Sequence, residues 1–126
     1  MHRILLAAPN PKPWAAFADA LVESRNIQLA WARTGAAALS DVMRHPPLCV
    51  VVDDPLPDMS ALEMVRRLLT VNAMVSTAVR SGLAAEDFHE ASEGLGVLLQ
   101  IPPTPGREHA GHLLAGLERI GMLTPG

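Results

Sequence analysis

The sequence predicts an α/β fold, a doubly wound sheet of five parallel strands combined with five helices. Short apolar runs alternate along the 126 residues with longer segments of helical periodicity, the order that right-handed strand–helix–strand units produce. The run from Leu48 to Val52 is continuously apolar, which is typical of a strand buried on both faces of a parallel sheet. Asp53, Asp54 and two prolines follow it, so the strand stops there and a loop begins.

The predicted strands are short, and prolines follow three of them. Pro9 begins a turn after the first strand, Pro55 follows the third and Pro102 follows the fifth. A continuous apolar core strand without polar alternation places the third strand in the middle of the sheet. We expect the five strands at Arg3–Ala7, Ile27–Ala32, Leu48–Asp53, Ala73–Ala78 and Val97–Gln100.

The predicted helices have apolar residues spaced three and four apart, with start and stop signals at their ends. Ser60 is suited to cap the third helix, and Glu63 would complete a capping box. Trp14 and Val22 lie on the expected buried stripe of the first helix, and Ile120 on that of the last. We expect helices over Pro13–Ser24, from Thr34-Gly35 to Arg44, from Ser60 onward, over Ala84–Ser92 and over Arg107–Ile120.

Composition limits the classes of function. The net charge is −3 with an isoelectric point near 5.9, and Lys and Arg form no cluster, which argues against direct nucleic-acid binding. No signal peptide and no run of membrane-spanning length is visible, so we expect no membrane association and a soluble, cytoplasmic protein. We expect one domain over residues 1–123, with 124–126 as a tail.

Cysteine and histidine give little sign of a special site. The single Cys49 falls in the central strand, where it is expected as a core residue, and its count excludes a disulfide framework. His109 and His112 lie one turn apart on the last helix, a spacing that could form half of a metal site. Without convergent partners, a surface helix face is the favoured interpretation and no metal site is expected.

The segment Val50–Leu62 resembles the phosphoacceptor signature of the receiver domains of two-component response regulators. In that family an Asp is followed four residues later by Pro and two further on by Met, before a helix; Asp53, Pro57 and Met59 match. The resemblance covers nearly the whole chain and implies the flavodoxin-like receiver fold. It also implies that Asp53 occupies the phosphoacceptor position and Thr77 the switch hydroxyl position.

The departures from the family pattern are equally informative. Where the family has an acidic pair that holds Mg²⁺ with the phosphoacceptor, this chain has Ala8 and Pro9. Where the family has a Lys before a Pro, this chain has Ile101, and Lys12 is its only lysine. Mg²⁺ prefers oxygen ligands, and phosphoryl transfer needs cations on the developing charge. We therefore expect a degenerate receiver with no cofactor, weak or absent Mg²⁺ binding and weak phosphorylation of Asp53.

Each candidate site residue has two interpretations. Asp53 could accept a phosphoryl group, but a structural relic at a strand end is favoured because its partners are missing. Thr77 could bond a phosphoryl oxygen or simply be a β-branched strand residue. Lys12 in the first loop and Arg80 in the fourth could supply compensating charge, although exposed cations are more commonly just solvated.

The leading functional hypothesis is an atypical receiver in two-component (phosphorelay) signalling that acts as an interaction or dimerisation module and not as an enzyme. Its partners would be a sensor kinase or another signalling protein, and a second copy bound through the face spanning Ala84–Leu123, which carries charges of both signs. One alternative is a phosphorylatable receiver using Asp53 with charge from Lys12 or Arg80. Another is a small-ligand sensor using the less polar crevice. An independent enzyme is disfavoured because neither a glycine-rich phosphate loop nor a nucleophile–histidine arrangement is recognisable.

Overall fold

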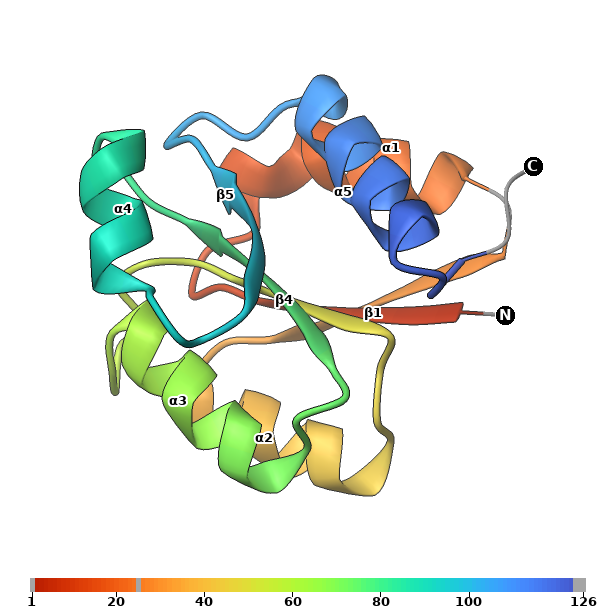
Figure 1. Ribbon diagram of the computed structural model, residues 1–126. Helices are drawn as coiled ribbons and strands as arrows, with labels where there is room; N and C mark the ends of the chain where they lie inside the picture. Colours follow the sequence, from red (N-terminus) through yellow and green to blue (C-terminus); the bar gives the residue numbers. More distant parts are fainter. Residues whose placement is uncertain (1, 25, 124–126) are drawn as a thin grey trace.

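A computed structural model describes residues 2–24 and 26–123, and its centre is a five-stranded parallel sheet in the order β2-β1-β3-β4-β5 (Figure 1). This order confirms the predicted doubly wound fold, because the chain winds outward from β1 in both directions. The expected tail at 124–126 lies outside the described residues. The strands are β1 (His2–Ala7), β2 (Ile27–Ala32), β3 (Cys49–Val52), β4 (Ser76–Arg80) and β5 (Val97–Ile101).

Helices cover both faces of the sheet (Figure 1): α1 and α5 pack on one face, and α2 and α3 on the other, with α4 beside the β4–β5 edge. None of the helices in the described part of the chain is long and apolar enough to cross a membrane. The helices are the 3-10 turn η1 (Lys12–Trp14), α1 (Ala15–Glu23), α2 (Gly35–Arg44), α3 (Ala61–Val71), α4 (Ala85–Ala91) and α5 (Arg107–Arg119).

The central strand β3 is buried on both faces, as the continuous apolar run predicts. Val50 and Val52 pack into the layer of α2 and α3, and Cys49 and Val51 into the layer of α1 and α5; all four are completely buried. Burying a valine contributes roughly 1.5–3 kcal/mol relative to leaving it exposed, so this packing fixes the strand from both sides. Asp53, the next residue, is thereby held at a defined position on the carboxyl edge of the sheet.

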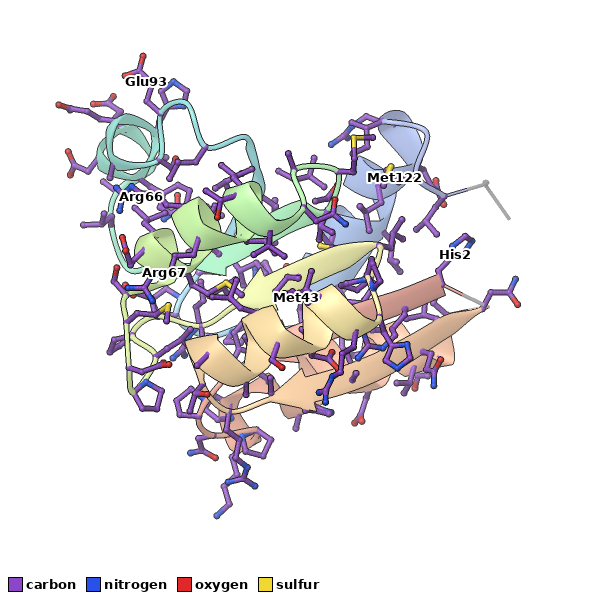
Figure 2. All side chains as sticks on the ribbon, turned by 90° about the horizontal axis from the view of Figure 1, so that it is seen from below. His2, Met43, Arg66, Arg67, Glu93 and Met122 are labelled. Carbon is purple, nitrogen blue, oxygen red and sulfur yellow. The ribbon has the colours of Figure 1, made fainter. Side chains whose placement is uncertain are left out.

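The start of α3 agrees in part with the predicted capping box. The Ser60 hydroxyl accepts a hydrogen bond from the backbone N–H of Glu63 (3.2 Å), as expected for a helix cap. The Glu63 carboxylate instead pairs along the helix with Arg66 and Arg67 at 3.6 and 3.2 Å. Figure 2 shows these two arginines on the outside of α3, where solvent limits what such pairs contribute.

The predicted position of the fourth strand is wrong at both ends. The residues before Ser76 form a turn, in which the Val75 N–H donates to Asn72 O, and pairing begins where the Ser76 N–H donates to Leu48 O. The strand continues to Arg80, two residues beyond the predicted end, because its buried middle extends through Val79. A charged residue therefore closes this strand at the carboxyl edge.

Two residues assigned to buried helix stripes are exposed. Val22 is 53% exposed and Ile120 is 52% exposed. The buried residues of α1 form a narrower stripe than predicted, centred on Phe17 and Leu21, and Val22 lies beside it. Ile120 comes directly after the last helical residue, Arg119, and lies outside the buried stripe of α5.

Candidate functional site

The carboxyl ends of β1 and β3 meet at the point where the strand order reverses direction, which is where open α/β sheets place their ligand sites. Asp53 lies there, directly after β3, and its backbone N–H donates to Ala7 O of β1 at 2.9 Å. The residue is only 3% exposed. A carboxylate with so little access to water requires partners within the protein.

Three donors hold the Asp53 carboxylate. Arg80 Nε lies 2.5 Å from Oδ1, the Trp14 indole N–H donates to Oδ2 at 3.2 Å, and the backbone N–H of Asp54 donates to Oδ1 at 2.7 Å. The side chains of Arg80 and Asp53 are 21% and 4% exposed, so this ion pair lies largely out of water. Both oxygens of the carboxylate are therefore engaged by the protein itself.

Arg80 is fixed by contacts beyond Asp53. A terminal nitrogen of its guanidinium donates to Pro103 O at 2.9 Å, and the guanidinium carbon lies 5.7 Å from the centre of the Trp14 ring. Trp14 is completely buried and packs edge-to-face against Phe17 with ring centres 5.2 Å apart. A planar cation held by an aromatic face, a carbonyl and a carboxylate has little freedom to leave.

The positions where the resemblance implies acids and a lysine contain apolar side chains. Ala8, the residue after β1, is 2% exposed, Pro9 follows it, and Ile101 at the end of β5 is completely buried. Ile101 is in register with Arg80 on the neighbouring strand. The cation of this crevice thus comes from the end of β4, one strand away from the position that the family pattern implies.

The histidines and carboxylates of the described residues form no cluster of three or more side chains that could hold a metal ion. His109 instead accepts a hydrogen bond at Nδ1 from the backbone N–H of Gly106 (2.8 Å) at the start of α5. Asp54 turns away from Asp53, as strand alternation predicts, and its Oδ1 accepts from the backbone N–H of Ala61 at the start of α3 (2.9 Å). The Asp54 carboxylate therefore adds no second acid beside the Asp53 carboxylate.

The structure separates the two cations proposed from the sequence. Arg80 reaches Asp53, whereas Lys12 is exposed on η1 and its ammonium group makes no hydrogen bond or ion pair with a described residue. Arg80 is the last residue of β4, whereas Lys12 lies on the exposed turn η1 that follows β1. Sequence alone could not choose between the two because both loops lie at the same edge.

The expected placement of Thr77 at the end of the fourth strand is wrong. Thr77 is the second residue of β4, pairs in register with Val50 and is 2% exposed. Asp53 lies three residues beyond Val50, so the hydroxyl sits well back from the carboxyl edge. Arg80 occupies the strand end at which the switch hydroxyl was expected.

Asp58 is a site residue that sequence reasoning missed. Its two carboxylate oxygens accept hydrogen bonds from the backbone N–H groups of Gly35 (2.8 Å) and Ala36 (2.9 Å), tying the β3–α3 loop to the start of α2. The hydrogen bonds from Ala36 and Gly35 hold the pKa of Asp58 below its usual value. Met59 packs over Gly35 at the same place, so closely that a side chain at Gly35 would collide with it. Gly35 and Ala36 precede Asp58 by 23 and 22 residues in the sequence, and no local pattern predicts that they meet.

The sequence matches no family model. No curated protein matches it significantly. Among solved structures it is similar to a CheY-like receiver domain protein from Methanospirillum hungatei, with 18% identity, a TM-score of 0.77 and coverage of 96% of this chain and 99% of that one. The chain is also similar to the response regulator domain of Thermotoga maritima CheB, with 16% identity, a TM-score of 0.76 and coverage of 99% of each chain.

A third similar structure is the signal receiver domain of an HD domain-containing protein from Pseudomonas fluorescens. It has 18% identity, a TM-score of 0.78 and coverage of 94% of this chain and 88% of that one. This chain has the receiver fold. The agreement spans nearly the full length of each structure although few residues are identical, which confirms the fold expected from the resemblance. In this fold the Asp53–Arg80 ion pair lies at the carboxyl edge of the sheet, where the sequence resemblance places the phosphoacceptor.

Proposed function

We propose that this protein is a receiver-like module of two-component signalling that acts through protein contacts and without Mg²⁺-dependent phosphorylation of Asp53. The ion pair between Asp53 and Arg80 carries the proposal. A phosphoacceptor needs a carboxylate oxygen free to attack and a metal ion that neutralises the incoming group. In this crevice protein donors already engage both oxygens of Asp53.

The energetics of the crevice support the same conclusion. An ion pair this little exposed has lost most of its hydration, and removing one partner leaves the other charge poorly compensated. For Mg²⁺ to bind Asp53, Arg80 would have to move away while its guanidinium also gave up the Pro103 carbonyl. The side chains of Ala8 and Ile101 add no oxygen ligand to compensate for that loss.

A phosphorylated receiver is the second candidate, and the same contact is the observation in its favour. Arginine binds phosphoryl oxygens well, so Arg80 could in principle hold the group transferred to Asp53. This route still lacks carboxylate ligands for the metal at Ala8 and Pro9. We therefore rank it below a phosphorylation-independent module.

Intact mass after incubation with acetyl phosphate and Mg²⁺ separates the two candidates. The samples are wild type and Asp53→Asn, read within minutes because acyl phosphates are labile, with an active receiver domain as the reagent control. The proposal expects no added phosphoryl mass on either sample. A phosphoryl adduct on the wild type that is absent from Asp53→Asn would overturn it. In that case Arg80→Gln would show whether Arg80 supplies the compensating charge.

The proposed partners are a sensor kinase or another signalling protein, and a second copy of this chain through α4, β5 and α5. β5 is an edge strand with four half-buried residues, and Phe88 is the only buried side chain of α4. Glu90 and other acids line the exposed side of α4, while Arg119 at the end of α5 forms no ion pair with a described residue. Arg107, in contrast, is already paired with Glu23. Opposite charges across a two-fold axis would therefore involve Arg119 and the acids of α4.

Molar mass by light scattering over a range of protein concentrations tests the dimer. We expect mass to rise toward that of a dimer and Arg119→Glu to hold the protein monomeric. Arg44→Glu is the matched control, an exposed arginine on α2; Figure 2 shows Met43 of α2 and Glu93, just past α4, well apart. A wild type that stays monomeric throughout, or equal effects of both variants, would contradict this interface.

A further inference from the structure

A hollow of about 360 Å³ opens at the carboxyl ends of β1 and β2, lined by Ala8, Pro11, Trp31 and Arg33. The volume falls in the range of small-molecule sites, roughly 300–1,000 Å³. It lies on the β2 side of the switch point, whereas Asp53 and Arg80 lie on the side of β3 and β4. This hollow is therefore separate from the ion pair and is not filled by it.

Trp31 gives the hollow its apolar wall. The chain has two tryptophans: Trp14 is completely buried and hydrogen-bonded to Asp53, whereas Trp31 is 43% exposed on the edge strand β2. Its indole N–H makes no hydrogen bond with a described residue. A large aromatic side chain left this open offers a flat surface on which another ring can stack. Pro11 and the small Ala8 leave room beside it.

Arg33 gives the hollow its charge. It is exposed directly after β2, and it forms no hydrogen bond or ion pair with a described residue. Lys12, next to Pro11, is a second exposed cation without such a partner. The rim is therefore positive although the chain as a whole carries a net charge of −3.

We propose that this hollow binds a planar aromatic carboxylate. The ring stacks on Trp31 beside Pro11, and the carboxylate pairs with the Arg33 guanidinium, which suits the planar geometry of a carboxylate. The combination of an apolar wall and one convergent charge is the usual composition of a small-ligand site. The inference is independent of the proposed function, because it uses neither Asp53 nor the α4–β5–α5 face.

The test uses 2-naphthoate as the probe and neutral 2-naphthamide as its matched control. Binding of each is measured by titration calorimetry and by the shifts of the two tryptophan indole N–H signals in NMR. We expect naphthoate to shift the Trp31 signal and leave that of Trp14 in place, and to bind more tightly than naphthamide. Arg33→Gln, an exposed change that leaves packing intact, should weaken naphthoate binding about tenfold or more. Arg44→Gln should leave it unchanged.

Trp31→Leu provides the second variant, with circular dichroism to confirm that it is folded. It should weaken both probes, because the stacking surface is lost for each. Equal affinity for naphthoate and naphthamide, no effect of Arg33→Gln, or no shift of the Trp31 signal at millimolar probe would each overturn the proposal.

Discussion

Replacing Arg80 by alanine is the most direct perturbation of the crevice. The substitution removes the cation whose Nε lies 2.5 Å from Asp53 Oδ1 and leaves a carboxylate that is 3% exposed. The Trp14 indole and the Asp54 backbone N–H remain as donors. The charge of Asp53 would then be held only by two neutral hydrogen bonds in a poorly hydrated position.

The magnitude follows from how buried the pair is. Breaking a fully buried pair by removing one partner costs about 3–5 kcal/mol. Arg80 is 21% exposed, so water can enter the vacated space, and two donors remain; we therefore expect Arg80→Ala to lower the free energy of unfolding by about 2 kcal/mol. For a domain of this size that corresponds to a fall of roughly 8 °C in Tm. In the Asp53→Asn background the same change should cost less than about 1 kcal/mol, because no charge is left uncompensated.

Urea unfolding, monitored by tryptophan fluorescence, measures the free energy of unfolding of wild type, Arg80→Ala, Asp53→Asn and the double variant. The control is Arg107→Ala, which removes an exposed ion pair with Glu23 and should leave stability nearly unchanged. If Arg80→Ala is as stable as wild type, or if Asp53→Asn does not reduce its cost, the argument that Arg80 compensates a buried charge is refuted.

Three further predictions concern the rest of the molecule. Gly35→Ala places a Cβ 2.5–2.8 Å from Met59 side-chain atoms, so we expect a loss of about 1 kcal/mol in urea unfolding, whereas Gly111→Ala, with open space around it, should gain about 0.5–1 kcal/mol; a gain at both positions would contradict the close packing. The lowered pKa of Asp58 stabilises the fold above the unfolded pKa near 4, and this stability is lost as pH falls through the folded pKa. Tm measured from pH 7 to 2 should therefore show wild type above Asp58→Asn at neutral pH and converging with it in acid, and a constant gap would refute this. Burial raises the pKa of the Cys49 thiol to about 12, so a disulfide reagent at pH 8 should label it only as fast as the protein unfolds, and rapid labelling of the native protein would show the packing to be wrong.

The sequence was sufficient for the parts of the fold that local patterns determine. The strand Ile27–Ala32 is confirmed at both ends, and the position of Asp53 at the end of β3 follows from the apolar run before it. The end of the first strand at Ala7 is also confirmed, and the fifth strand ends at Ile101, one residue beyond its predicted end, directly before Pro102. These features depend on hydrophobicity and chain-breaking residues within a few positions of one another.

Features that depend on contacts distant in sequence could not be predicted. Arg80 was one of two candidate cations, and its choice depends on β4 running two residues further than its apolar pattern suggested. Trp14 was correctly assigned to the core, but nothing in a helix stripe indicates that its indole N–H faces Asp53 39 residues away. The bonds from Gly35 to Asp58 likewise join two loops that approach only after the sheet has formed.

The differences between this crevice and the family pattern have a combined effect on its charge. In the family pattern that the sequence resembles, three carboxylates face one lysine, an excess of two negative charges that matches a divalent cation. Here Ala8, Pro9 and Ile101 remove two of those acids and the lysine, so one carboxylate remains, and Arg80 supplies the one positive charge that balances it. We therefore propose that this crevice, in which Arg80 balances the charge of Asp53, recruits Mg²⁺ weakly or not at all, and that an unpaired Asp53 would destabilise the fold. Restoring the acids at positions 8 and 9 while Arg80 remains should therefore not be enough to restore the metal site, because the guanidinium would still occupy the Asp53 carboxylate.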